Sequence, residues 1–167
     1  TNITSEDIAY ATELGYRVKH LGLAIRRKDG IELRTHPCLL RNEELLASVN
    51  GVMNAIQIEG DAVGPTLHYG AGAGSEPTAS AVVADIVDVV RALTTDPNNR
   101  VPHLAFQPQS VSDLPILNIE QIETPFYLRL DVFDQPGVLA DITRILGFQS
   151  ISIEAILQKG TSSQGHT

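Results

Sequence analysis

The sequence predicts an α+β protein: mostly antiparallel sheet with packed helices, followed by a linker and a small β-α-β unit. Two observations predict this class. Short strand-like segments separated by turns fill residues 16–70, as expected for antiparallel hairpins. Apolar residues recur at spacings of three and four over residues 78–93 and again after residue 138, which is the period of an amphipathic helix.

Composition favours a packed domain without nucleic-acid or membrane partners. Of the 167 residues 43% are hydrophobic, and 20 acidic against 12 basic side chains give a net charge of −8. Nucleic acids bind through basic phosphate contacts, so we expect no nucleic-acid partner. No apolar stretch is long enough to span a bilayer, no signal peptide is present, and a single cysteine forms no intrachain disulfide. We therefore expect a cytoplasmic protein with no membrane partner.

The chain begins with a predicted helix. Thr4 or Ser5 is placed to cap it, and Glu6 and Asp7 in its first turn favour the positive end of the helix dipole. Gly15 is a natural stop because glycine adopts the left-handed conformation that ends many helices.

Strands and turns fill the next part of the chain. Lys28-Asp29-Gly30 and Asn50-Gly51 are turn sequences. Six of the twelve basic residues lie between Arg17 and Arg34, which we interpret as a charged, solvated hairpin. The predicted elements are strands over residues 16–27, 31–37, 52–60 and 64–70, and a short helix over residues 41–48.

The helix predicted over residues 78–93 has one apolar side, which we expect to pack against a sheet or another helix. Its apolar residues are Val82, Ile86, Val89, Val90 and Leu93.

Composition changes after Leu93. Residues 94–120 hold four of the nine prolines together with polar residues, and we interpret them as a linker. Residues 121–160 then show strand-like alternation, an amphipathic helix and a second strand, which makes a β-α-β unit with parallel strands. Its helix is expected to turn Leu139, Ile142, Ile145 and Leu146 inward. Residues 161–167 form a polar tail.

The stretch YGAGAGSEPTASAVVADI is the strongest candidate for ligand binding. A dinucleotide fingerprint needs a third glycine that would fall at Ser75 or Pro77, so this is not the first turn of a Rossmann domain. Two interpretations remain open. The glycines permit a tight turn before a helix capped by Ser75, or they permit the close approach of a nucleotide. Glu76 argues against a phosphate there, because its charge already occupies the helix N-terminus.

The residues show no complete catalytic constellation. Five histidines are scattered without the spacing of metal ligands, although His36 and His68 are placed to approach each other across strands. Cys38 follows a proline and precedes two leucines, so we expect a buried structural thiol.

Two groups of motifs resemble a known family. ITSEDIAYATELGYRVKHLGLA, GDAVGPTLHYGAGAG and PTASAVVADI resemble the C-terminal part of the catalytic region of homoserine dehydrogenase. FDQPGVLADIT resembles the first half of an ACT domain, a ferredoxin-like amino-acid-sensing module that many members of this family carry. The resemblance covers residues 1–160: a catalytic-region part over residues 1–93, the linker, and a partial ACT domain over residues 121–160.

The resemblance implies an NAD(P)-dependent interconversion of L-homoserine and L-aspartate 4-semialdehyde, on the route to threonine and methionine. It also implies that Gly72, Gly74 and Thr78 contact the NAD(P) cofactor. The family's catalytic motif, D-x-x-G-x-D-A-x-x-K, and its substrate-binding motif, Y-x-E-G-I, do not occur here. We therefore assign no catalytic residue, and we expect this chain by itself not to oxidise homoserine.

The ACT-like part implies binding of an amino-acid effector, for which we expect threonine. The implied effector-binding residues are Asp134, Gln135, Gly137, Val138 and Leu139. A plain capped turn is an equally good interpretation of this loop. Two other functions stay open: an amino-acid-sensing ACT module without catalysis, and a sheet over residues 17–70 that acts mainly as the surface of a homo-oligomer.

Overall fold

The computed structural model describes residues 3–96, 105–133 and 135–159, and the predicted polar tail lies outside these ranges. The chain divides into two compact units. The first unit contains Thr1–Leu21, His36–Arg41 and Glu123–Thr167, and the second contains Gly22–Thr35 and Asn42–Ile122. None of the helices in the described ranges is long and apolar enough to cross a membrane.

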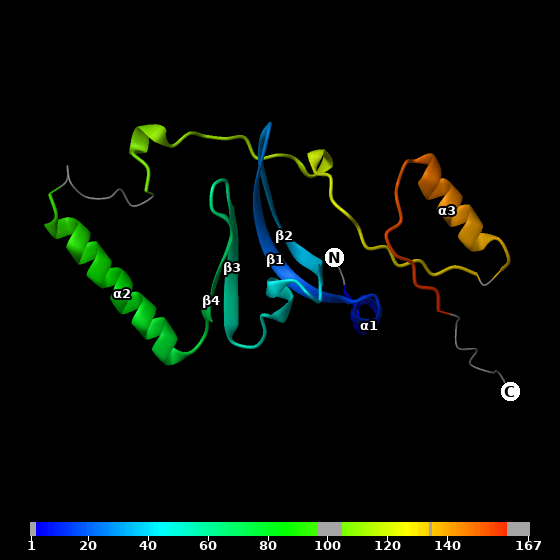
Figure 1. The fold of residues 1–167 in the computed structure, drawn as a ribbon, viewed down its shortest axis with the longest axis horizontal. Coiled ribbons are helices and arrows are strands. Elements are labelled where there is room, and N and C mark those ends of the chain that lie inside the picture. The colour runs from blue at the N-terminus through cyan, green and yellow to red at the C-terminus, as the bar shows by residue number, and fades with distance from the viewer. Residues whose placement is uncertain (1–2, 97–104, 134, 160–167) are drawn as a thin grey trace. The chain divides into compact units, whose positions relative to one another are not determined.

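Three α-helices and four strands follow one another along the chain (Figure 1). They are α1 (Ser5–Glu13), β1 (Tyr16–Arg27), β2 (Gly30–Arg41), β3 (Met53–Gly60), β4 (Gly64–Ala71), α2 (Ser75–Thr94) and α3 (Val138–Phe148), with short 3-10 turns at Leu45–Ser48, Pro108–Ser110 and Ile119–Gln121. The predicted α+β class and the antiparallel hairpins are confirmed.

The strands form two separate two-stranded sheets, β1–β2 and β3–β4. The expectation of one sheet running through residues 17–70 is therefore wrong. A 3-10 turn at Leu45–Ser48 interrupts the chain after β2, so that β3 pairs with β4, the strand that follows it through a tight turn. Neighbours in sequence pair most readily because their loop is the least costly to close.

Helix α1 begins where the sequence predicted. Thr4 is its N-cap, and a reciprocal capping box joins Thr4 and Asp7: the Asp7 N–H donates to Thr4 Oγ1 at 3.3 Å, and the Thr4 N–H donates to Asp7 Oδ2 at 2.7 Å. The helix ends at Glu13 with Leu14 as its C-cap, and Gly15, with a φ of +84°, turns the chain immediately after it. Both helix ends are thus fixed by local sequence.

The extended segment after Glu123 is tied to α1 by side chains. The Tyr127 hydroxyl donates to Asp7 Oδ1 at 3.1 Å, and Arg129 Nη1 lies 2.9 Å from the same oxygen and 2.8 Å from Thr4 Oγ1. At the C-terminal end of α1, Lys159 Nζ lies 2.5 Å from Glu13 Oε1. These contacts place charged and polar side chains of the C-terminal segments on the N-terminal helix.

The predicted β-α-β unit is confirmed only in its helix, α3. Residues 122–133 and 151–159 contain no strand in the described chain. Their alternating pattern suits an extended backbone, but a strand also needs a neighbouring backbone to bond, and the side-chain contacts with α1 do not supply one. The strands of this unit were therefore predicted wrongly.

The pKa of Asp7 lies below its ordinary value, first because the Thr4 backbone N–H and hydroxyl donate to its carboxylate, and further because of Tyr127 and Arg129. A carboxyl whose pKa is lowered on folding adds stability above its unfolded pKa and loses that contribution as the pH falls through the folded pKa. We expect the urea concentration at the unfolding midpoint of the wild type to decrease as the pH is lowered below about 4. The Asp7→Asn variant should lose part of this pH dependence.

Asp141→Asn is the matched control for the pH measurement. Asp141 is exposed, and its side chain pairs within the described residues only with Arg144 on the surface of α3, at 2.9 Å. Its variant should keep the acid dependence of the wild type. An Asp7→Asn profile parallel to that of the wild type would show that the contacts of Asp7 do not stabilise the fold.

A buried carboxylate lies in Gly22–Thr35, the part of the β1–β2 hairpin that belongs to the second unit. Glu32 is only 1% exposed, and its oxygens lie 2.7 Å from Arg27 Nη2 and 2.6 Å from Arg34 Nε. The contact with Arg34 is ionic but not aligned as a hydrogen bond. The predicted solvated hairpin is thus partly wrong, because the Arg34 side chain is only 13% exposed.

Part of the predicted linker is fixed to the start of β2. The Ile31 N–H donates to the Pro115 carbonyl at 2.8 Å, and the Leu117 N–H donates to the Ile31 carbonyl at 2.9 Å, so that Ile31 and Ile116 form a parallel bridge. Gly30 makes this approach possible, since an added Cβ would lie 2.3 Å from the Pro115 carbonyl oxygen.

Few large apolar side chains are covered in the part of the chain that the structure describes. The buried hydrophobic residues there are Ala11, Leu40 and Ala47. Helices α2 and α3 bury no residue, and Ile86 and Leu93 on the apolar side of α2 are 57% and 75% exposed. The expected packing of these helices is therefore not found, and the inward positions predicted for α3 are not buried either.

Candidate functional site

The glycine-rich stretch forms the junction between β4 and α2. Strand β4 ends at Ala71 and α2 begins at Ser75, three residues earlier than predicted. Gly74 is the N-cap, with a φ of +123° and no side-chain cap, so the predicted capping by Ser75 is wrong. The Thr78 N–H donates to the Gly74 carbonyl at 3.2 Å, which places Thr78 at the end of the first helical turn.

Gly72 has a steric reason to be glycine. Strands β3 and β4 pair Asn54 with Gly70, and the Gly72 N–H extends this ladder by donating to the Val52 carbonyl at 2.9 Å. A Cβ added to Gly72 would lie 1.6 Å from Asn54 Nδ2, whereas one added to Gly70 would meet nothing within 4 Å. The Asn54 side chain therefore reaches past Gly70 and rests on Gly72.

Gly74 has a conformational reason to be glycine. Its φ of +123° lies in a region that side chains with a Cβ rarely adopt, and the nearest atom to an added Cβ is Pro77 Cδ at 3.3 Å. Both glycines thus serve the turn itself. The geometry agrees with the interpretation of the stretch as a tight turn before a helix. The same residues are exposed, so a nucleotide can also approach them.

The junction fits an uncharged part of a nucleotide better than a phosphate. Gly70 and Gly74 offer backbone without side chains, and Thr78 carries an exposed hydroxyl one turn into the helix. Glu76 lies in the first turn of α2, where its charge opposes a second anion. The three predicted cofactor-binding residues, Gly72, Gly74 and Thr78, thus lie together at one junction.

The predicted effector-binding residues lie at the start of α3, except Asp134, which is outside the described residues. Gly137 is the N-cap of α3 with a left-handed φ of +96° and no side-chain cap. The Val138 N–H donates to the Gln135 carbonyl at 3.4 Å, and Leu139 follows in the first turn. These contacts form a tight turn at the N-terminus of the helix.

The other candidates do not assemble a catalytic site in the described chain. His36 and His68 lie in different sheets, and His68 faces Ile56 across β3. Cys38 is half-buried rather than buried, and its Sγ lies 3.4 Å from His36 Nδ1. No group of three His, Cys, Asp or Glu side chains among the described residues is arranged to hold a metal ion.

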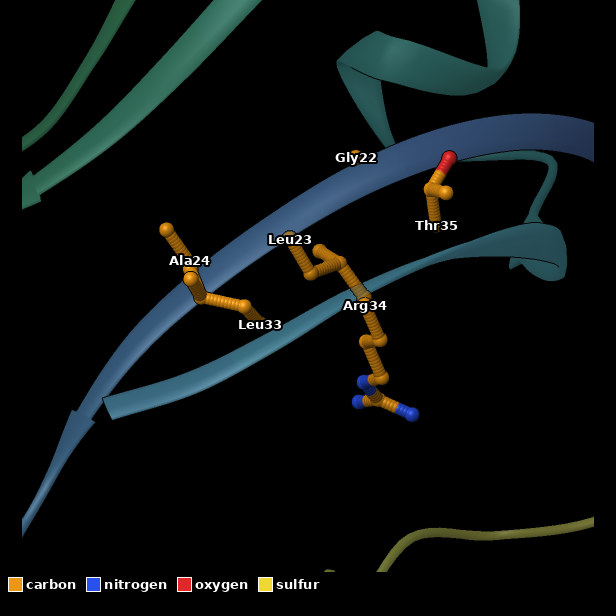
Figure 2. A pocket seen from close by; sticks show the side chains of 6 residues that line it. All are labelled: Gly22, Leu23, Ala24, Leu33, Arg34 and Thr35. Carbon is orange, nitrogen blue, oxygen red and sulfur yellow. The ribbon is translucent and has the colours of Figure 1, made fainter. Parts of the chain in front are cut away.

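A shallow hollow lies on the β1–β2 hairpin and is mainly apolar (Figure 2). Arg34 is the one ionisable side chain of its lining, and Glu32 already holds it in an ion pair. The lining therefore offers no acid or base for chemistry. It consists of Gly22, Leu23, Ala24, Leu33, Arg34 and Thr35.

Two residues with notable contacts in the structure were missed from the sequence. Glu32 looked like part of a charged hairpin, and nothing in its neighbourhood marks it as buried. Asn54 could have been noticed, because it is a polar residue within the mainly apolar stretch VMNAIQI. Its contact with Gly72 follows from the diagonal register of β3 and β4, which the sequence does not state.

Comparison with known proteins shows the family to which this chain belongs. The family model for homoserine dehydrogenase matches residues 1–87. The homoserine dehydrogenases of Pseudomonas aeruginosa and Neisseria gonorrhoeae are 60% and 51% identical to it over 164 residues, which is 98% of this chain. The chain therefore belongs to the homoserine dehydrogenase family.

A solved structure supports this assignment. The crystal structure of a homoserine dehydrogenase from Thiobacillus denitrificans matches 94% of this chain with a TM-score of 0.84 and 64% sequence identity. The match covers 36% of that protein, and each of the two curated relatives is covered over 38% of its length. The chain thus spans little more than a third of the relatives that it matches.

Proposed function

We propose that this chain is the part of a homoserine dehydrogenase that closes one side of the cofactor site. The reaction is the NAD(P)-dependent interconversion of L-homoserine and L-aspartate 4-semialdehyde in threonine and methionine biosynthesis. The observation that carries the proposal is the exposed β4–α2 junction at Gly72–Thr78, in a chain that is 60% identical to a curated member of the family.

The bound NAD(P) supplies the hydride chemistry, and this chain supplies surface for binding it. Gly74 exposes backbone that no Cβ shields, so a flat ring or a ribose can approach closely. Thr78 offers a hydroxyl near the N-terminus of α2. Glu76 keeps a phosphate away from this end, which favours an uncharged part of the cofactor there.

The exposed faces of the helices support a place within a larger enzyme. Val82, Ile86 and Leu93 on α2 are 52%, 57% and 75% exposed. Burying apolar surface of this kind contributes about 25 cal/mol per Å². We propose that the remainder of the enzyme covers α2 and thereby fixes the position of the glycine junction beside the cofactor.

A chimeric enzyme tests the proposal. This chain would replace the matching 164 residues of the Pseudomonas aeruginosa homoserine dehydrogenase, to which it is 60% identical. We expect the chimera to reduce NAD(P)+ with homoserine, measured by the absorbance of the NAD(P)H formed, and this chain alone to show no rate above background. A folded chimera without activity would contradict the proposal, as would homoserine oxidation by the chain alone.

Amino-acid regulation through the start of α3 is part of the proposal. The tight turn around Gly137 presents a helix N-terminus without a side-chain cap, which suits a carboxylate. We propose that Asp134, Gln135, Gly137, Val138 and Leu139 bind threonine as a feedback effector. Threonine should then inhibit the chimera, and a threonine titration that leaves the rate unchanged would contradict this role. A chimera that binds threonine without any catalysis would favour a purely regulatory module.

We also propose a cytoplasmic homo-oligomer. Ile56 and Ile58 lie on one face of β3 and are 65% and 50% exposed. They lie toward the Gly60–Gly64 turn, which is the end of the hairpin away from Gly72. Exposed apolar strand faces of this kind commonly mediate association. Analytical ultracentrifugation of the chimera should show an oligomer, and a monomer at high concentration would argue against it.

A further inference from the structure

The side chain of Asn54 lies on the glycine junction. Asn54 pairs directly with Gly70, and residues two apart on a strand share a face, so Asn54, Gly70 and Gly72 lie on one face of the β3–β4 hairpin. The site of a Cβ on Gly72 is 1.6 Å from Asn54 Nδ2 and 2.4 Å from Asn54 Cγ. The carboxamide thus occupies the space that the missing side chain of Gly72 leaves.

This carboxamide is exposed and makes no side-chain hydrogen bond to another described residue. Its neighbours on the same face are Gly70, Gly72 and His68 across the hairpin and the apolar residues Val52 and Ile56 along β3. Only the imidazole of His68 among these side chains can form a hydrogen bond, and none joins it to Asn54 in the described chain. The two N–H donors and the carbonyl acceptor of Asn54 are therefore available to a ligand at the junction.

We propose that Asn54 is a dinucleotide-binding residue whose carboxamide, seated on Gly72, hydrogen-bonds a neutral polar group of NAD(P). The inference rests on the proposed function, which places the cofactor at Gly72, Gly74 and Thr78. It adds the hydrogen-bonding side chain that a stretch of glycines and alanines lacks. The negative charge of Glu76 makes a ribose hydroxyl or an amide the matching ligand group rather than a phosphate.

Asn54→Ala in the chimera tests the inference. One hydrogen bond to a neutral group should weaken NAD(P)H binding about threefold to tenfold when it is lost. The dissociation constant is measured by the fluorescence of NAD(P)H without homoserine, and the KM for homoserine should stay unchanged. Gln57→Ala is the matched control, because Gln57 is an exposed amide on the same strand but on the opposite face, paired with Leu67.

A double variant tests whether the contact with Gly72 matters. Gly72→Ala displaces the carboxamide and adds a methyl group beside the cofactor, so it should weaken binding at least as much as Asn54→Ala does. Because Gly72→Ala already removes the hydrogen bond of Asn54, Asn54→Ala/Gly72→Ala should bind no more weakly than Gly72→Ala alone. Effects of the two changes that simply add, or wild-type affinity in Asn54→Ala, would overturn the inference.

The same titrations separate this inference from the proposed function. A folded wild-type chimera that binds no dinucleotide would refute the proposed function, and the inference with it. The inference alone would be refuted if the wild-type chimera binds NAD(P)H, Gly74→Ala lowers this affinity and Asn54→Ala leaves it unchanged.

Discussion

Gly74→Ala is expected to weaken cofactor binding by the chimera about tenfold to a hundredfold. The φ of Gly74 is +123°, and a side chain forced into such a region costs about 1–3 kcal/mol. We expect the backbone of the junction to shift in order to relieve this strain, which displaces the groups that contact the cofactor. A loss of about 1.4 kcal/mol in binding free energy corresponds to a tenfold lower affinity. The KM for NAD(P)+ and the dissociation constant of NAD(P)H should both rise, while the KM for homoserine should change little.

Gly64→Ala is the control for backbone strain. Gly64 begins β4 at the other end of the same hairpin, has a φ of +73°, and has no atom within 4 Å of an added Cβ. Its variant should lose a similar amount of stability but keep the wild-type affinity for NAD(P)H. Equal loss of affinity in both variants would mean that general destabilisation, and not the position of the junction, controls cofactor binding.

Gly30→Ala is expected to destabilise the second unit by about 1–3 kcal/mol, the usual cost of inserting a methyl group where there is no space. The added Cβ would lie 2.3 Å from the Pro115 carbonyl oxygen and 3.1 Å from Leu117 Cδ2. Because the first of these atoms belongs to the backbone, it cannot rotate away. The hydrogen bonds that join Ile31 to Pro115 and Leu117 should therefore break.

The measurement is the urea midpoint, with Gly22→Ala as the matched control. Gly22 lies within β1 of the same hairpin, and an added Cβ there would meet nothing within 4 Å. Alanine in a strand restricts the unfolded chain more than glycine does, so Gly22→Ala should be neutral or slightly stabilising. A Gly30→Ala midpoint equal to that of Gly22→Ala would show that the linker contact contributes nothing.

Elements fixed by near neighbours in the sequence were predictable. Thr4 and Asp7 are three residues apart, so the capping box that starts α1 can be read from the sequence. The β3–β4 hairpin follows in the same way from two strands and the short Gly60–Gly64 turn. The cofactor contacts of Gly74 and Thr78 stay a prediction from the resemblance, and the structure adds that Gly74 caps the helix.

Features that depend on distant partners were not predictable. The C-terminal segments alternate like strands, but whether a strand forms depends on a neighbouring backbone, and here Tyr127 and Arg129 contact α1 instead. Glu32 is buried because Arg27 and Arg34 converge on it, which a count of charges along the chain does not show. Asn54 was missed because its contact crosses the hairpin diagonally.

Hydrogen–deuterium exchange on the chimera tests the central claim most directly, namely that the β4–α2 junction closes over the cofactor. With saturating NAD(P)H, we predict slower exchange in peptides covering residues 70–80, and no change in peptides covering the Gly60–Gly64 turn or α1. Protection elsewhere in the chimera, with residues 70–80 exchanging at the same rate with and without NAD(P)H, would contradict the claim.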